Sequence, residues 1–164
     1  MTGAERVERL RACGSEPFES AVPVRSFPSY RGQRNRPGLW WSTTVGRHAG
    51  YESWLERDHA MLLAFDPQVL GYSSQPRDGL RARRHAPDFS TRLADGSAVV
   101  IGCRPPGRIR AADAVAFEAT TQGSELVGWE YRLVGESLAG TVRRLTGYRH
   151  PRPGPVARLV TRVG

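Results

Sequence analysis

The sequence contains no lysine, since all 24 basic residues of the 164 are arginine. It has only two cysteines, Cys13 and Cys103, and four histidines, too few for a disulfide framework and a poor basis for a structural zinc site. It also lacks a long apolar run, and the segment Met1–Leu10 has no signal-peptide core. These absences predict a cytoplasmic protein with free thiols and no membrane contact.

The positive charge is large and unevenly distributed. The formal net charge is +8, yet no acidic residue lies between Glu19 and Glu52 or after Glu136, and arginines occur through both segments. Because a guanidinium matches the geometry of a phosphate, these segments favour contact with double-stranded DNA, while a solubilising surface with disordered tails is the alternative. The arginines expected at the DNA are Arg31, Arg34, Arg36, Arg47, Arg81, Arg83 and Arg84.

The length suits a single domain with a real core. Residues 1–39 are rich in Pro, Gly and Arg, and read as a basic N-terminal arm with a short helix at Ala4–Ala12. Residues 40–151 form the expected core, and residues 152–164 form a basic tail rich in Pro and Arg.

Hydrophobic periodicity predicts the elements of this core. In chain order they are a short strand or a docked apolar patch at Trp40–Thr44, a helix at Tyr51–Phe65, a strand at Val69–Ser74, strands at Pro87–Leu93 and Ser97–Arg104, a helix at Ala111–Thr121, a strand at Gly128–Val134 and a helix at Glu136–Leu145. The loop Ala94-Asp95-Gly96 is a hairpin signal. The order predicts an α/β fold with a mixed central sheet flanked by helices.

Three charged residues are expected to meet on this sheet. Because strand side chains alternate, Gly102 and Arg104 share one face. A three-residue hairpin loop places Asp88 opposite either Gly102 or Arg104, depending on how the loop is counted. Glu56 would point at Asp88 if its helix face covers the sheet. The pattern therefore predicts a Glu, an Asp and a cation that converge, with a gap at residue 102.

These residue types suit the hydrolysis of a phosphodiester. Carboxylates are hard oxygen ligands for Mg²⁺ or Mn²⁺, which ionises the attacking water and neutralises charge in the transition state. Glu56 and Asp88 are therefore the candidate metal ligands. A cation such as Arg104 would position the water and the scissile phosphate, completing a candidate catalytic set.

The same residues lie in five stretches that resemble a known family. The stretches are Tyr51–Asp58, Phe65–Val69, Gln75-Pro76, His85–Phe89 and Val100–Pro105. They resemble the TnsA-like endonuclease subunits of heteromeric transposases, over roughly Trp40–Pro151. The resemblance implies a restriction-endonuclease-like core of the PD-(D/E)xK superfamily, Mg²⁺-dependent DNA cleavage in transposition, and a partner transposase subunit; a homodimer is also allowed. It matches Glu56, Asp88, Gly102 and Arg104 to the family's site positions.

Gly102 is the departure from this pattern, because glycine has no side-chain ligand where the family has Gln or Asp. The family usually has Lys or Arg at the position of Arg104. Unlike Lys, Arg104 stays protonated, so it can hold a phosphate but cannot act as a base. Two functions follow. One is an endonuclease weakened at this degenerate ligand position; the other is a nuclease-fold protein that binds DNA or a transposase partner without cutting. Among the remaining residues, Trp41 and Trp54 are expected in the core and Asp58 on the surface.

Overall fold

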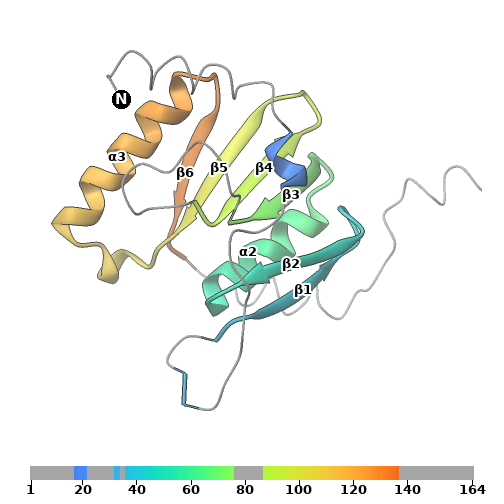
Figure 1. The fold of residues 1–164 in the computed structure, drawn as a ribbon, viewed down its shortest axis with the longest axis horizontal. Helices are drawn as coiled ribbons and strands as arrows, with labels where there is room; N and C mark the ends of the chain where they lie inside the picture. Colours follow the sequence, from blue (N-terminus) through green and yellow to red (C-terminus); the bar gives the residue numbers. More distant parts are fainter. Residues whose placement is uncertain (1–16, 22–31, 34–35, 76–86, 137–164) are drawn as a thin grey trace, which may run out of the picture.

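The computed structural model describes residues 17–21, 32–33, 36–75 and 87–136 (Figure 1). Its elements are η1 (Phe18–Ser20), β1 (Gly38–Ser42), β2 (Arg47–Tyr51), α2 (Trp54–Phe65), β3 (Val69–Ser74), β4 (Phe89–Leu93), β5 (Ala98–Cys103), η2 (Pro106–Arg108), α3 (Ala111–Glu125) and β6 (Glu130–Val134). Within these ranges, no helix is both long enough and apolar enough to traverse a bilayer.

The central sheet has four strands in the order β3-β4-β5-β6. The first two pairings are antiparallel and follow the chain, whereas β5 and β6 are parallel and are joined through α3. A parallel pair needs such a crossover, because a tight turn cannot reverse the chain direction twice. The predicted α/β fold with a mixed sheet is confirmed.

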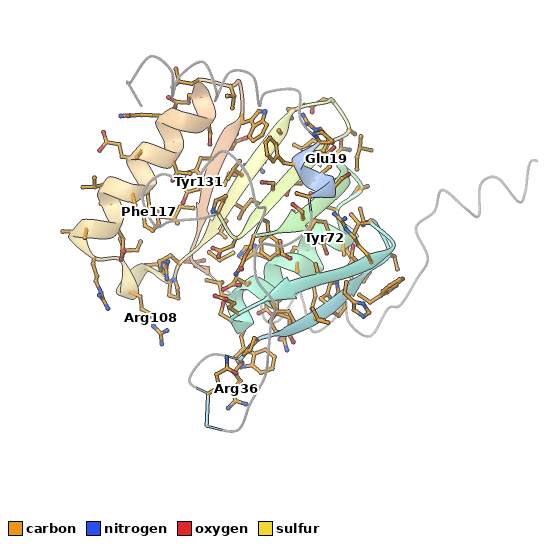
Figure 2. All side chains as sticks on the ribbon, in the orientation of Figure 1. Glu19, Arg36, Tyr72, Arg108, Phe117 and Tyr131 are labelled. Atoms are coloured by element: carbon orange, nitrogen blue, oxygen red, sulfur yellow. The ribbon has the colours of Figure 1, made fainter. Side chains whose placement is uncertain are left out.

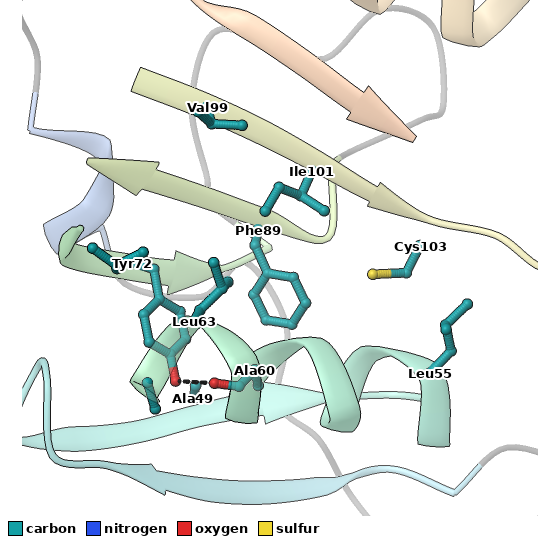
Figure 3. Close-up of a cluster of buried hydrophobic side chains, with 11 residues drawn as sticks. Ala49, Leu55, Ala60, Leu63, Tyr72, Phe89, Val99, Ile101 and Cys103 are labelled. Carbon is teal, nitrogen blue, oxygen red and sulfur yellow. Dashed lines mark hydrogen bonds between the residues drawn. The ribbon is translucent and has the colours of Figure 1, made fainter. Parts of the chain in front are cut away.

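Helix α2 packs between this sheet and the two-stranded β1–β2 ribbon. Ser53 caps its N-terminus, because the Ser53 hydroxyl accepts a hydrogen bond from the Glu56 amide. The helix covers the sheet face that carries Val99, Ile101 and Cys103, and these side chains join one core cluster with it (Figure 3). This face of the sheet is closed by apolar contacts along its length.

The opposite face of the sheet carries a smaller cluster. Val100 lies there with Ala98, Phe18 and Trp129, and the rings of Phe18 and Trp129 meet edge to face at 5.0 Å. Helix α3 approaches the same face, where Phe117 lies 6.5 Å from the ring of Tyr131. Both faces are therefore flanked by helical elements, as predicted.

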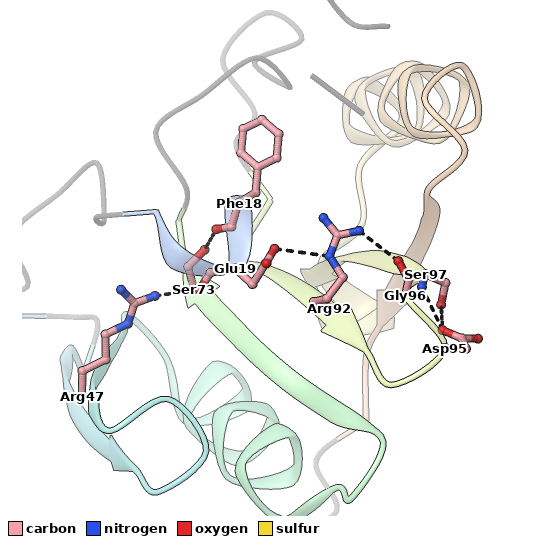
Figure 4. Close-up of polar contacts among 8 residues, drawn as sticks. All are labelled: Phe18, Glu19, Arg47, Ser73, Arg92, Asp95, Gly96 and Ser97. Carbon is pink, nitrogen blue, oxygen red and sulfur yellow. Dashed lines mark hydrogen bonds and ion pairs between the residues drawn. The ribbon is translucent and has the colours of Figure 1, made fainter. Parts of the chain in front are cut away.

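The hairpin and η1 are fixed by polar contacts (Figure 4). Gly96 adopts φ +85 in the β4–β5 loop, a conformation that favours glycine, and Asp95 accepts hydrogen bonds from the amide and hydroxyl of Ser97. At η1, the Ser73 hydroxyl donates to the Phe18 carbonyl at 2.6 Å. Phe18 thus attaches part of the expected N-terminal arm to the core.

Three predictions of local structure were wrong. Tyr51 ends β2 and does not begin the helix, because residues 47–51 pair with β1 and α2 starts only after its Ser53 cap. Trp41 and Trp54 are 52% and 48% exposed, since each lies on the outer side of its element. Asp58 is buried, with the Arg57 guanidinium 2.8 Å from its carboxylate.

Other predictions concern parts of the chain that lie outside the described residues. They are the helix at Ala4–Ala12, almost all of the helix at Glu136–Leu145, the basic tail at 152–164, and the DNA-contact residues Arg31, Arg34, Arg81, Arg83 and Arg84.

Candidate active site at one end of the sheet

The predicted site residues gather at the end of the sheet where β3, β5 and β6 finish and β4 begins. Asp88 directly precedes β4 and Arg104 directly follows β5. The register pairs Phe89 with Ile101, which places Asp88 beside Gly102, the first of the two predicted alternatives. The N-terminus of α2 reaches the same end, where Leu55 lies near Cys103 (Figure 3).

Asp88 is held in place by hydrogen bonds to both neighbouring strands. Its amide donates to the Ile101 carbonyl at 2.9 Å, and its carbonyl accepts from the Gln75 amide at 2.8 Å. Its Oδ2 accepts the Cys103 amide at 2.6 Å. The carboxyl therefore lies against the backbone at the end of β5 and is not free to swing into solvent.

The environment of Asp88 favours its protonated form. Burial raises the pKa of this carboxyl to about 7, and the negative charge of Glu56 adds to the increase. The hydrogen bond from Cys103 and the charge of Arg104 act in the opposite direction but are smaller. Glu56 and Arg104 are thus both close enough to act on Asp88.

Glu56 is buried and belongs to the cap of α2. Its Oε2 accepts the Glu52 amide at 2.7 Å, and its Oε1 accepts the Ser53 hydroxyl at 2.8 Å. Burial raises the pKa of the Glu56 carboxyl, while these two hydrogen bonds and the charge of Arg104 lower it. The residue is therefore a capping residue that also contributes negative charge to the site.

Arg104 supplies the positive charge. Its amide donates to the Val134 carbonyl at 2.8 Å, which fixes the backbone where β5 and β6 end. Its charge lowers the pKa values of both Glu56 and Asp88. Within the described residues, its buried Nε has no hydrogen-bond partner. The structure therefore brings together all three residues of the predicted catalytic set.

The gap at Gly102 is filled by a residue that sequence analysis missed. A Cβ built on Gly102 would collide with the hydroxyl of Tyr131, and it would lie 3.3 Å from Tyr131 Cζ and 3.4 Å from Leu133 Cδ1. Tyr131 belongs to β6, and only the parallel pairing of β5 with β6 brings it here. No local motif in the sequence marks that pairing.

Gln75 lies on the other side of Asp88, at the end of β3. It is 7% exposed, has φ +43, and its side-chain Oε1 is buried without a hydrogen-bond partner in the described part of the chain. A non-glycine residue in this conformation is uncommon and is often found at functional sites.

These residues fit a hard divalent cation only in part. Glu56 and Asp88 offer carboxylate oxygens, which Mg²⁺ and Mn²⁺ prefer. No group of three or more His, Cys, Asp or Glu suited to a metal occurs among residues 17–21, 32–33, 36–75 and 87–136. Cys103 is no substitute, because burial raises the pKa of its thiol and it packs in the core as predicted. Further oxygens would have to be neutral ones, such as those of Tyr131 and Gln75.

The described arginines differ in their availability to DNA. The Arg47 guanidinium donates to the Glu19 and Ser20 carbonyls at 2.6 and 3.0 Å, which gives it a structural function (Figure 4). Arg36 is exposed, and its amide donates to Glu52 at 3.2 Å, beside the start of α2. Arg108 and Arg110 are also exposed and lie between β5 and α3. Figure 2 shows Arg36 and Arg108 at the same end of the molecule.

The sequence matches no protein-family profile and no curated protein. The functional assignment therefore depends on the geometry of this site and on the order of its motifs.

Proposed function

We propose that this chain is a TnsA-like DNA endonuclease subunit that works with a partner transposase and cleaves phosphodiester bonds with Mg²⁺ or Mn²⁺. The observation that carries the proposal is the convergence of Glu56, Asp88 and Arg104 from three separate elements, with both other charges acting on the Asp88 carboxyl. The proposal includes a restriction-endonuclease-like core. The order α2, three antiparallel strands, α3 and a parallel strand supports this.

Each residue has a distinct role in this proposal. Asp88 and Glu56 would hold the cation, and Asp88 must release its proton when the cation binds. The cation would supply a more acidic water and neutralise charge on the phosphate. Arg104 donates to the scissile phosphate and remains protonated throughout, so the proton of the attacking water must go to another acceptor. The missing ligand at Gly102 should make cation binding weak.

Cleavage of supercoiled plasmid and of transposon-end DNA, with the partner subunit present, tests this function. We expect metal-dependent nicking by the wild type and a loss of at least about 100-fold in Asp88→Asn, beyond what is typical for loss of a group that only supports a ligand. Glu118→Gln removes a negative charge from an exposed position on α3 and should cleave normally. Equal activity in Asp88→Asn and the wild type would refute the assignment.

A second candidate function is DNA binding without cleavage. The observation that favours it is the Tyr131 hydroxyl, which occupies the space where a ligand side chain at residue 102 would lie. This candidate predicts salt-dependent DNA binding with no metal-dependent nicking, even with the partner present. Absence of DNA binding at low salt would exclude both functions.

The salt dependence of binding identifies the arginines at the DNA. If Arg36 contacts a phosphate, Arg36→Ala should reduce the slope of log K against log salt by about 1. Arg132→Ala is the matched control. This half-exposed arginine is already paired with Glu130, so its loss should leave the slope of log K against log salt unchanged. Arg47→Ala should leave the slope unchanged and lower the stability of the fold, since its guanidinium bonds η1.

A further inference from the structure

Trp54 is an exposed aromatic side chain at the end of the sheet that carries the candidate site. It is the first residue of α2, directly after the Ser53 cap, and it is 48% exposed. Two residues further on, Glu56 is close enough for its charge to act on Asp88. A tryptophan that was expected in the core therefore lies in solvent within one helical turn of Glu56.

The Trp54 ring is held from one side by a cation. The guanidinium carbon of Arg57 lies 4.1 Å from the ring centroid, which is the geometry of a cation–π contact. The same guanidinium donates from Nε and Nη2 to Asp58 Oδ1 at 3.2 and 2.8 Å, and the Asp58 side chain is only 4% exposed. Because Arg57 covers one face of the indole and nearly half of Trp54 stays accessible, the opposite face is open to a planar ligand.

The charges around Trp54 favour an anionic ligand. Arg36 is exposed, and its amide donates to the Glu52 carbonyl at 3.2 Å, so it is anchored two residues before Trp54. The neighbouring acids are less exposed than Arg36, since Glu56 and Asp58 are buried and Glu52 is partly buried. A strand that lies along the start of α2 would therefore bring its phosphates to Arg36 before they meet a carboxylate.

Trp41 provides an internal comparison. It is 52% exposed on the outer side of the β1–β2 ribbon, and its ring meets that of His48 edge to face at 5.1 Å. The arginine next to His48 is Arg47, whose guanidinium already bonds to two carbonyls of η1. Exposure alone does not distinguish the two tryptophans. What distinguishes Trp54 is the stacked Arg57 and the exposed Arg36 beside it.

We propose that the open face of Trp54 stacks on an unpaired base of DNA while Arg36 contacts a phosphate of the same strand. This inference rests on the proposed DNA function, and it assigns to the substrate a locally single-stranded segment beside the site. Every base has a π-face, so such a contact tolerates any sequence. A duplex in which every base is paired and stacked offers Trp54 no free base face.

Binding of fluorescently labelled oligonucleotides to the full chain at low salt tests this inference. For a single strand, Trp54→Ala should weaken binding by at least about 5-fold, the lower end for the loss of one stacked base, whereas Trp54→Phe should retain most of the affinity. For a duplex closed by hairpin loops of a non-nucleotide linker, the same Trp54→Ala should change the affinity by less than about 2-fold, because phosphate contacts dominate duplex binding.

Two further variants serve as controls. Trp41→Ala removes an equally exposed tryptophan and should leave the affinity for both kinds of DNA unchanged. Arg36→Ala should weaken the binding of single strand and duplex alike, because a phosphate contact does not depend on base pairing. Thermal unfolding of each variant establishes that it is folded.

The outcomes separate this inference from the proposed function. If folded Trp54→Ala keeps its affinity for the single strand, or loses as much affinity for the duplex, the stacking inference fails even where the wild type nicks plasmid. If it keeps that affinity but no longer responds to the partner subunit, Trp54 is a protein contact and the inference fails as well. Wild-type protein that binds neither DNA at low salt overturns the inference and the proposed function together.

Discussion

The two faces of the central sheet each bury a tyrosine hydroxyl, that of Tyr72 from β3 and that of Tyr131 from β6, and only one of the two is paired within the described residues. Tyr72, on the α2 face, donates to the Ala60 carbonyl at 2.9 Å (Figure 3). Tyr131, on the α3 face, has no partner for its hydroxyl within the described residues. Burial raises the pKa of both to about 12, so the pKa alone does not distinguish them. Hydrogen bonding within the described residues is what distinguishes the two phenols.

The faces differ because they are covered differently. On one face, α2 and the β1–β2 ribbon enclose a continuous apolar core that includes Tyr72 and Phe89. On the other, η1 and α3 cover a smaller cluster, and Val115 on α3 is 69% exposed. Within the described residues, the α2 face therefore carries the larger of the two buried cores. The comparison leads to four predictions.

The largest effect should come from truncating a phenylalanine on the α2 face. Phe89→Ala should cost about 3–5 kcal/mol of unfolding free energy, because the enclosed core cannot collapse around the cavity. Phe117→Ala on α3 should cost less, since Phe117 is buried but belongs to neither of the two buried core clusters. Urea unfolding measures both. Equal costs would mean that the two faces are equally well packed.

The next effect is a pH dependence that arises from Asp88. Its pKa is about 7 in the folded protein and 3.8 in a free side chain, so the folded state retains a proton that the unfolded state releases between these values. Stability should therefore fall as pH rises from about 4 to 7, by at most about 1.4 kcal/mol per pH unit, and then level off. The stability that the Asp88 proton contributes is fully present below the free pKa of 3.8 and is lost above the folded pKa of about 7.

Urea midpoints at pH 5 and pH 8 test this dependence. Asp88→Asn should remove most of the loss, leaving the smaller part from Glu56, whose pKa is also raised. Asp95→Asn is the control, because hydrogen bonds from Ser97 lower the pKa of this exposed turn residue. An Asp88→Asn protein that retains the full slope would show that Asp88 is ionised in the fold.

Much of the fold could be predicted because local signals coincide. Asp66-Pro67 marks the end of α2, and the loop Ala94-Asp95-Gly96 marks the β4–β5 hairpin. Strand β2 was missed because Arg47–Tyr51 lacks clear alternation and runs directly into the helix pattern. No local motif reveals its pairing with Gly38–Ser42.

The site could be predicted only where it depends on neighbouring strands. Asp88 and Gly102 belong to one hairpin, so counting residues across the loop places them side by side. Tyr131 lies far along the chain and reaches the site through a parallel pairing, whose register is not set by a turn. The capping role of Glu56 was likewise hidden, because the same Ser-x-x-Glu spacing serves a helix cap and a metal site.

The third effect tests the crowding at Gly102. Gly102→Ala should destabilise the fold by about 1–3 kcal/mol through overpacking against Tyr131. The cost should decrease in a Tyr131→Phe background, because the colliding hydroxyl is gone. Gly123→Ala is the control: a Cβ there meets no atom within 4 Å, and alanine in a helix interior should stabilise α3. A cost at Gly102 that is unchanged by Tyr131→Phe would locate the conflict elsewhere.

The smallest effect compares the two hydroxyl groups themselves. Tyr72→Phe should cost about 0.5–1.5 kcal/mol, because it removes a buried hydrogen bond to the Ala60 carbonyl. Tyr131→Phe should cost nothing or stabilise the protein slightly, since it removes a buried oxygen that has no partner among the described residues. Thermal unfolding without divalent cations measures both. Equal losses would mean that Tyr131 is paired within the fold, and its hydroxyl would then be as structural as that of Tyr72.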